Sequence, residues 1–150
     1  MDKAALKAVE DTFVGLNGLG LQKEPLETAS LIVKDGKEVY TRTFSDSDTP
    51  VFIDVEKRTN KILNVYANEL EHTTAEYPAV FDKLEGYSEE QLLKQATIQA
   101  KRLLSIDLTG YKASKNPQMV GVVYFTRKGT PTLVGRYNSK GQFYVLGFEE

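Results

Sequence analysis

The feature that most constrains the fold is a repeat with an offset of 81 residues. The stretch TPVFIDVEKRTNKILNVYA (49–67) returns as TPTLVGRYNSKGQFYVLGF (130–148), with the same Thr-Pro start and the same rhythm of strand, turn and strand. With the same offset, Phe44 meets Phe125. A repeat of this kind predicts that the two copies fold alike.

The turns of the two copies carry matching chemistry. In the second copy Gly141 closes the turn NSKG, as expected for a type I turn followed by a left-handed residue at a bulge. In the first copy the same position holds Asn60, the side chain that best tolerates a positive φ after glycine. Both copies therefore predict a left-handed residue at one point between two strands.

Local patterns predict the remaining elements. Apolar residues at helical spacing predict a helix over 2–16, and the capping box from Ser88 to Gln91 predicts a second helix over 89–105. Alternation and turn residues predict strands at 30–33, 38–44, 51–55 and 61–67 in the first half and at 119–126, 132–137 and 142–148 in the second half.

These elements predict an α+β fold made of two tandem modules, each with one helix packed on a small three-stranded antiparallel sheet. The first module is expected at 1–70, a connector at 71–87 and the second module at 88–150. A single module of about 65 residues is near the lower limit for independent stability, so the two modules are expected to pair and complete the core.

Two segments resemble PepSY-type domains. FIDVEKRTNKIL (52–63) resembles the strand–turn–strand signature of that family, and SEEQLLKQATIQAKRLL (88–104) resembles its opening helix. The sequence departs from the family pattern where Asn60 replaces the turn glycine and where Gly135 of the second copy replaces the strand aspartate Asp54. The resemblance implies a PepSY/cystatin-like fold, an extracytoplasmic location, and either regulation or inhibition of a peptidase or a scaffolding role at the bacterial cell envelope.

Composition excludes several kinds of site. The chain has no cysteine, which excludes disulfides, thiolate metal sites and a cysteine nucleophile. The first residues, MDKAALKAVEDTF, lack the basic flank and apolar run of a signal peptide, and no apolar stretch approaches the roughly 20 residues that span a bilayer. A membrane tether, if the protein has one, is expected in a segment outside this sequence.

Charge is divided unequally along the chain. Residues 101–150 hold eight Lys or Arg against three Asp or Glu, a formal charge of +5, whereas residues 1–100 hold 11 against 18, a formal charge of −7. The basic second half suits an anionic partner, although two solvated surfaces of unlike sign explain the same numbers.

No motif for catalysis or for metal binding stands out. His72 is the only histidine, and Glu69, Glu71 and Glu76 would be its companion metal ligands, although a solvated connector explains the same residues. No G-x-S-x-G sequence supplies a serine for His72 to activate. The stretch DSD (46–48) lacks the later glycine and glutamate of an EF-hand. The sequence therefore predicts no enzyme activity, no metal and no cofactor.

The sequence instead predicts a protein-binding module, in which an open edge strand accepts an extended segment of the partner by β-augmentation. The hairpin turns 46–50 and 127–131 and nearby basic side chains are the expected contact points. The predicted partner-binding residues are Asp46, Asp48, Arg127, Lys128, Arg136 and Lys140. The expected partner is a peptidase or an envelope protein. Nucleic acid is not expected, because the net charge of −2 is slightly acidic.

The alternative is a carrier of a small apolar ligand. A helix on a curved sheet can enclose an apolar pocket, and Phe125, Leu133, Phe143 and Val145 would line it. The same four residues would equally serve to fill a core.

Overall fold

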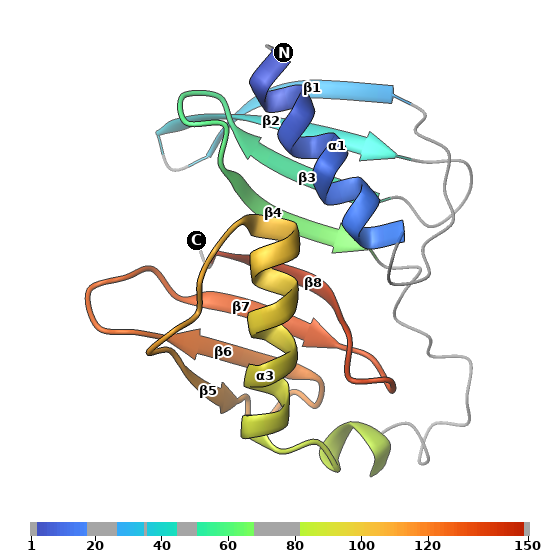
Figure 1. The fold of residues 1–150 in the computed structure, drawn as a ribbon, viewed down its shortest axis with the longest axis vertical. Coiled ribbons are helices and arrows are strands. Elements are labelled where there is room, and N and C mark those ends of the chain that lie inside the picture. Colours follow the sequence, from blue (N-terminus) through green and yellow to red (C-terminus); the bar gives the residue numbers. More distant parts are fainter. Residues whose placement is uncertain (1–2, 18–26, 35, 45–50, 68–81, 149–150) are drawn as a thin grey trace.

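The computed structural model describes residues 3–17, 27–34, 36–44, 51–67 and 82–148. They form one antiparallel sheet of eight strands in the order β1-β2-β3-β4-β8-β7-β6-β5. Both long helices lie on the same face of this sheet (Figure 1). The opposite face, called the open face below, carries no helix among the described residues.

Each half of the chain contributes four strands. The first half supplies α1 (Lys3–Asn17), β1 (Glu27–Lys34), β2 (Lys37–Phe44), β3 (Val51–Glu56) and β4 (Ile62–Ala67). The second half supplies α3 (Glu89–Gln99), the π-helix η2 (Ala100–Leu104), β5 (Lys112–Lys115), β6 (Val122–Thr126), β7 (Leu133–Tyr137) and β8 (Phe143–Phe148).

The prediction of two tandem modules with three-stranded sheets is wrong, because β4 and β8 pair directly and make the sheet continuous. Asn64 lies opposite Gly147, and Tyr66 lies opposite Val145. Gly147 permits this pairing, since a Cβ atom there would collide with the side chain of Asn64. The repeated hairpins are therefore the two central hairpins of a single sheet.

The core confirms that the two halves form one unit. One cluster of buried apolar side chains lies between the helices and the sheet and draws on α1, α3, η2 and strands from both halves. Its fully buried large side chains include Leu16, Ile53, Leu92, Phe125, Leu133, Phe143 and Leu146.

The strand β5 is the element that the sequence pattern does not predict. Its residues, KASK, alternate charged with small side chains and offer little apolar surface. Pairing with β6 makes it a strand, since Ala113 lies opposite Phe125 and packs against the core. Tertiary contact thus overrides weak local propensity.

The helix predicted over 89–105 is confirmed as α3 and η2. The N–H of Gln91 donates to Ser88 Oγ at 3.1 Å, and the N–H of Ser88 donates to Gln91 Oε1 at 2.9 Å. These two bonds form the predicted capping box, which satisfies two N–H groups at the start of the helix.

The left-handed turn residues are also confirmed. Asn60 has a φ of 59° and Gly141 a φ of 75°. The strand register shifts between Asp54 and Val55 in the first hairpin and between Arg136 and Tyr137 in the second, as expected for a bulge near each turn.

Two polar contacts tie the helices to the rest of the core. The buried Thr12 hydroxyl of α1 donates to the carbonyl of Leu103 in η2 at 2.7 Å. Gln99, which is 2% exposed, exchanges two hydrogen bonds with the backbone of Phe143: its Nε2 donates to the Phe143 carbonyl and its Oε1 accepts from the Phe143 N–H, each at 2.8 Å. Gln99 therefore acts as a strand neighbour for the first residue of β8.

Candidate functional site

The outer edge of β1 is the most open backbone surface in the described part of the chain. β1 is eight residues long and pairs with β2 on one side, and no described strand pairs with it on the other side. It forms the upper edge of the sheet in Figure 1. A long edge strand presents a row of N–H and C=O groups that another strand can use.

Two apolar side chains stand exposed along this edge. Leu31 is 48% exposed and Val33 is 71% exposed. Leu31 lies opposite Tyr40, which packs against the core, so Leu31 and Val33 belong to the helix-bearing face of the sheet. They form an apolar rim beside the open backbone edge.

The opposite edge of the sheet is protected. β5 has only four residues, and lysines occupy both of its ends. The N–H of Lys115 donates to Glu89 Oε2 at 2.9 Å, and its side chain donates to the carbonyl of Glu85 at 3.2 Å. Short length, positive charge and a side-chain cap are ordinary ways of blocking strand addition. The two edges of this sheet therefore differ in what they can bind.

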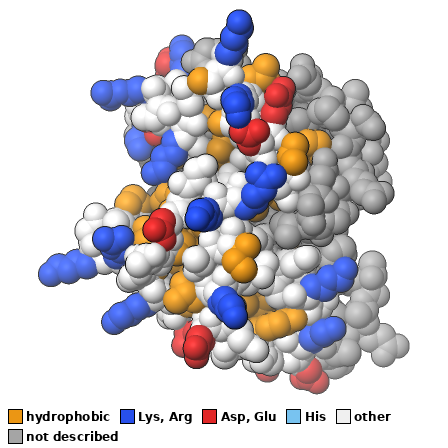
Figure 2. All heavy atoms as spheres, viewed as in Figure 1, with side chains coloured by type: hydrophobic (Ala, Val, Ile, Leu, Met, Phe, Trp, Pro, Cys, Tyr) orange, Lys and Arg blue, Asp and Glu red, His pale blue; other side chains and the backbone are white. Residues whose placement is uncertain are grey.

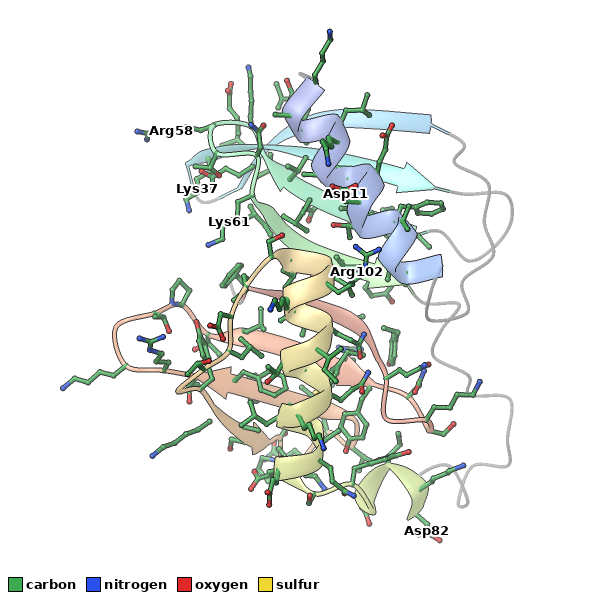
Figure 3. All side chains as sticks on the ribbon, viewed as in Figure 1. Asp11, Lys37, Arg58, Lys61, Asp82 and Arg102 are labelled. Carbon is green, nitrogen blue, oxygen red and sulfur yellow. The ribbon has the colours of Figure 1, made fainter. Side chains whose placement is uncertain are left out.

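One end of the sheet is basic. The strand register places the β1–β2, β3–β4 and β6–β7 turns at this end, and Figure 2 shows Lys and Arg side chains along the corresponding left margin. The basic residues in and beside these turns are Lys37, Lys57, Arg58, Lys61, Arg127 and Lys128. We call this set the basic end. Figure 3 labels Lys37, Arg58 and Lys61.

Few carboxylates offset the charge of the basic end. Glu56 lies 3.6 Å from the Lys37 ammonium, and Glu38 lies 3.3 Å from the Lys57 ammonium. Asp107 is a third acid nearby, and hydrogen bonds from the hydroxyl and N–H of Thr109 lower the pKa of its carboxyl, with smaller contributions from nearby positive charges. The remaining cations of these turns are exposed and form no ion pair with a carboxylate among the described residues, although Lys61 lies over the Phe148 ring.

The structure does not gather the predicted partner-binding residues into one patch. Arg127 and Lys128 lie at the basic end, where Arg127 Nη1 donates to the carbonyl of Thr109 at 3.3 Å. Arg136 is exposed on the open face of β7, opposite Val145. Lys140 lies in the β7–β8 turn, at the other end of β7. The predicted sites Asp46 and Asp48 lie outside the described residues.

The residues predicted to line an apolar pocket serve different roles. Phe125, Leu133 and Phe143 are buried in the core, and the ring centroids of Phe125 and Phe143 lie 5.6 Å apart. Val145 lies opposite Arg136 and faces the open side of the sheet. Three of the four side chains are therefore packed against one another rather than around a space.

The candidate metal ligands of the connector, His72 with Glu69, Glu71 and Glu76, lie outside the described residues. Within the described residues, His, Asp and Glu side chains do not gather in groups of three that would hold a metal ion. The helices of that same part of the chain are too short or too polar to cross a membrane.

Sequence patterns miss Leu31 and Val33 as functional residues. The run SLIV is apolar, and an apolar run indicates a strand without indicating whether its side chains are buried. Only the strand order shows that this segment is the outermost strand of the sheet.

Comparison of the chain with protein-family models, with curated proteins and with solved structures gave no match.

Proposed function

We propose that this protein is a non-enzymatic binding module that takes an extended segment of a partner protein along the outer edge of β1. One observation carries the proposal: the edge offers eight residues of strand with no described neighbour and exposes Leu31 and Val33 beside it. Addition of a strand to such an edge is a common mode of peptide recognition.

The chemistry of the edge defines the segment that fits it. Outward backbone groups of alternate residues in β1 would pair with the backbone of the segment. Leu31 and Val33 would contact apolar side chains at alternate positions, and covering each of them stabilises the complex by about 1 kcal/mol. The nearby basic end favours an acidic residue where the segment passes the β1–β2 turn.

The resemblance of residues 52–63 and 88–104 to PepSY-type domains supports a peptidase or a protein of the bacterial cell envelope as the partner to test first. In that setting the module would regulate or inhibit the peptidase, or hold envelope proteins together, outside the cytoplasm.

Selection from a library of displayed peptides tests the proposal. The wild-type protein should enrich segments with apolar residues at alternate positions and an acidic residue near one end. Val33→Lys places a charge on the edge and should weaken binding of the enriched peptides by about tenfold or more, with an unchanged melting temperature.

Ile98→Lys is the matched control, because Ile98 is 60% exposed on α3, away from β1. It should bind the enriched peptides as the wild type does. Equal binding by the two lysine variants would exclude β1 as the binding edge.

A further inference from the structure

A groove lies where the two halves of the chain meet, between α1, the β3–β4 turn and η2. Its volume is about 460 Å³, and side chains of all three elements line it, among them Asp11, Thr12, Asn60, Arg102, Leu104 and Ser105. Small-molecule sites in proteins commonly have volumes of about 300–1,000 Å³. The groove differs from the edge of β1 in the groups that it offers. It is a concave surface of side chains, whereas the edge offers backbone N–H and C=O groups.

Two left-handed backbone positions line this groove. Asn60 has a φ of 59° and Ser105 a φ of 57°, and they are the non-glycine residues with positive φ in the described part of the chain. Asparagine tolerates this conformation well, whereas for the serine that ends η2 it is less common. Both positions place a side-chain oxygen at the groove where glycine would place none.

The side chain of Asn60 has an unmet hydrogen-bonding requirement. Its Oδ1 is buried and has no hydrogen-bond partner among the described residues. The other buried side-chain N and O atoms of the described residues all have a hydrogen-bond partner. A buried polar atom without a partner is rare in folded proteins and calls for a physical reason. Because this oxygen has almost no accessible surface, a rotation of the Asn60 side chain toward the groove would let an N–H or O–H group of a ligand supply the missing donor.

Arg102 supplies an available positive charge. Among the described residues no carboxylate forms an ion pair with it, whereas Lys7 pairs with Asp11 at 2.9 Å and Lys61 Nζ lies 4.7 Å from the centroid of the Phe148 ring. Figure 3 shows Arg102 reaching from the end of the helix toward α1, which carries Asp11. Guanidinium groups bind carboxylate and phosphate groups with directed hydrogen bonds.

The local backbone fixes Arg102 in this place. It belongs to η2, and π-helical turns are rare and are frequently found at functional sites. Its stem passes close to α1 at Gly15, where a Cβ atom would lie 3.2 Å from Arg102 Cγ and 2.8 Å from Leu103 Cδ2. Gly15 thus allows the close approach that brings the guanidinium to the groove.

We propose that this groove binds a small organic anion that also carries a hydroxyl or amino group. Arg102 holds the carboxylate or phosphate group, and the side-chain oxygens of Asn60 and Ser105 accept hydrogen bonds from the donor group. This site is independent of strand addition at β1, so either can fail without the other.

Titration of the ¹⁵N-labelled protein with four probes tests the site. Malate and glycerol phosphate carry an anion and a hydroxyl, whereas succinate and inorganic phosphate carry the anion without a carbon-borne hydroxyl. At matched ionic strength, all four should shift the amide resonances of the groove saturably. Malate should bind about threefold to tenfold more tightly than succinate, the ratio expected from one additional hydrogen bond.

Two variants separate the roles of the residues. Arg102→Gln should weaken all four probes by about tenfold or more, because it removes the charged donor. Lys101→Gln is the matched control, since it removes a charge from the same η2 segment at a residue that does not line the groove. Asn60→Gly keeps the left-handed turn, so the variant should unfold at the same or a higher urea concentration. It removes the Asn60 oxygen and should therefore erase the preference for malate over succinate.

Absence of saturable shifts with every probe would overturn the proposal. Equal weakening by Arg102→Gln and Lys101→Gln would also overturn it, because the response would then report general charge. A preference for malate that persists in Asn60→Gly would refute the role given to the Asn60 oxygen.

Discussion

Replacing Gln99 with methionine tests the contact that holds the start of β8 against α3. In the wild-type protein the Gln99 amide both donates to and accepts from the backbone of Phe143, at 2.8 Å in each case. Methionine has a similar length but is only a weak acceptor. The variant therefore leaves a buried N–H and a buried C=O of Phe143 without partners.

The structure gives the size of the expected effect. Each buried backbone group that loses its partner costs about 1–3 kcal/mol. Burial of an apolar side chain in place of the amide returns about 1 kcal/mol. Gln99→Met leaves two such groups and should therefore lower the free energy of unfolding by about 1–5 kcal/mol, compared with the 5–15 kcal/mol typical of a domain.

Urea unfolding followed by circular dichroism measures this change, provided that the dependence on urea keeps the same slope in both proteins. Gln118→Met is the control, because Gln118 is exposed and the change there should be neutral within about 0.5 kcal/mol. A loss at Gln99 as small as that of the control would refute the reasoning.

Two further predictions concern contacts between elements. Thr12→Val removes the hydroxyl that donates to the Leu103 carbonyl and should lower the free energy of unfolding in urea by about 1–3 kcal/mol, whereas Thr12→Ser should retain most of it, and equal losses would contradict the role of the hydroxyl. Burial, with smaller contributions from Glu85 and Tyr87, raises the pKa of the Tyr137 phenol above its ordinary value of about 10. Above that pH the unfolded chain loses this proton before the native protein does, so the stability contributed by Tyr137 is complete below pH 10 and declines as the pH rises through the raised value. Tyr137→Phe lacks the hydrogen bond to the Leu84 carbonyl and should be less stable than the wild type at pH 7. Its stability should nevertheless decline less steeply above pH 10, and an unchanged decline would contradict this origin.

Features with a local cause were predictable from sequence. The capping box depends on residues three positions apart, and the left-handed turns depend on the tolerance of Asn60 and Gly141 for positive φ. These interactions are complete within one turn of chain, so no distant residue alters them.

Features with a distant cause were not predictable. The pairing of β4 with β8 requires a residue without a side chain opposite Asn64. Gly147, on a strand from the other half of the chain, meets this requirement. The sheet edge that remains open, and with it the exposure of Leu31 and Val33, follows from that pairing. The groove beside Arg102 exists only because α1 and η2 approach at Gly15.

The comparison of the two repeats shows how a small register error misleads. The offset of 81 residues aligns Asp54 with Gly135. In the structure Ile53 is buried in the core, and Gly135 faces the core as well, with a Cβ atom there placed 2.6 Å from the Phe143 ring. The structural counterpart of Gly135 is therefore Ile53, because the turn between Val55 and Ile62 in the first hairpin is one residue longer than the turn between Tyr137 and Phe143 in the second. A shift of one residue exchanges the two faces of a strand.

The order of the strands also has a consequence for synthesis on the ribosome. The central position beside β4 belongs to β8, which is the last strand to be made: β4 ends at residue 67, and β8 begins at residue 143, 76 positions later. At ordinary rates of translation, β4 waits about 4–15 s for its neighbour. During this time the strand edge of β4 in the nascent chain has no partner. In a chain that ends before residue 143, β4 never gains β8 as its neighbour.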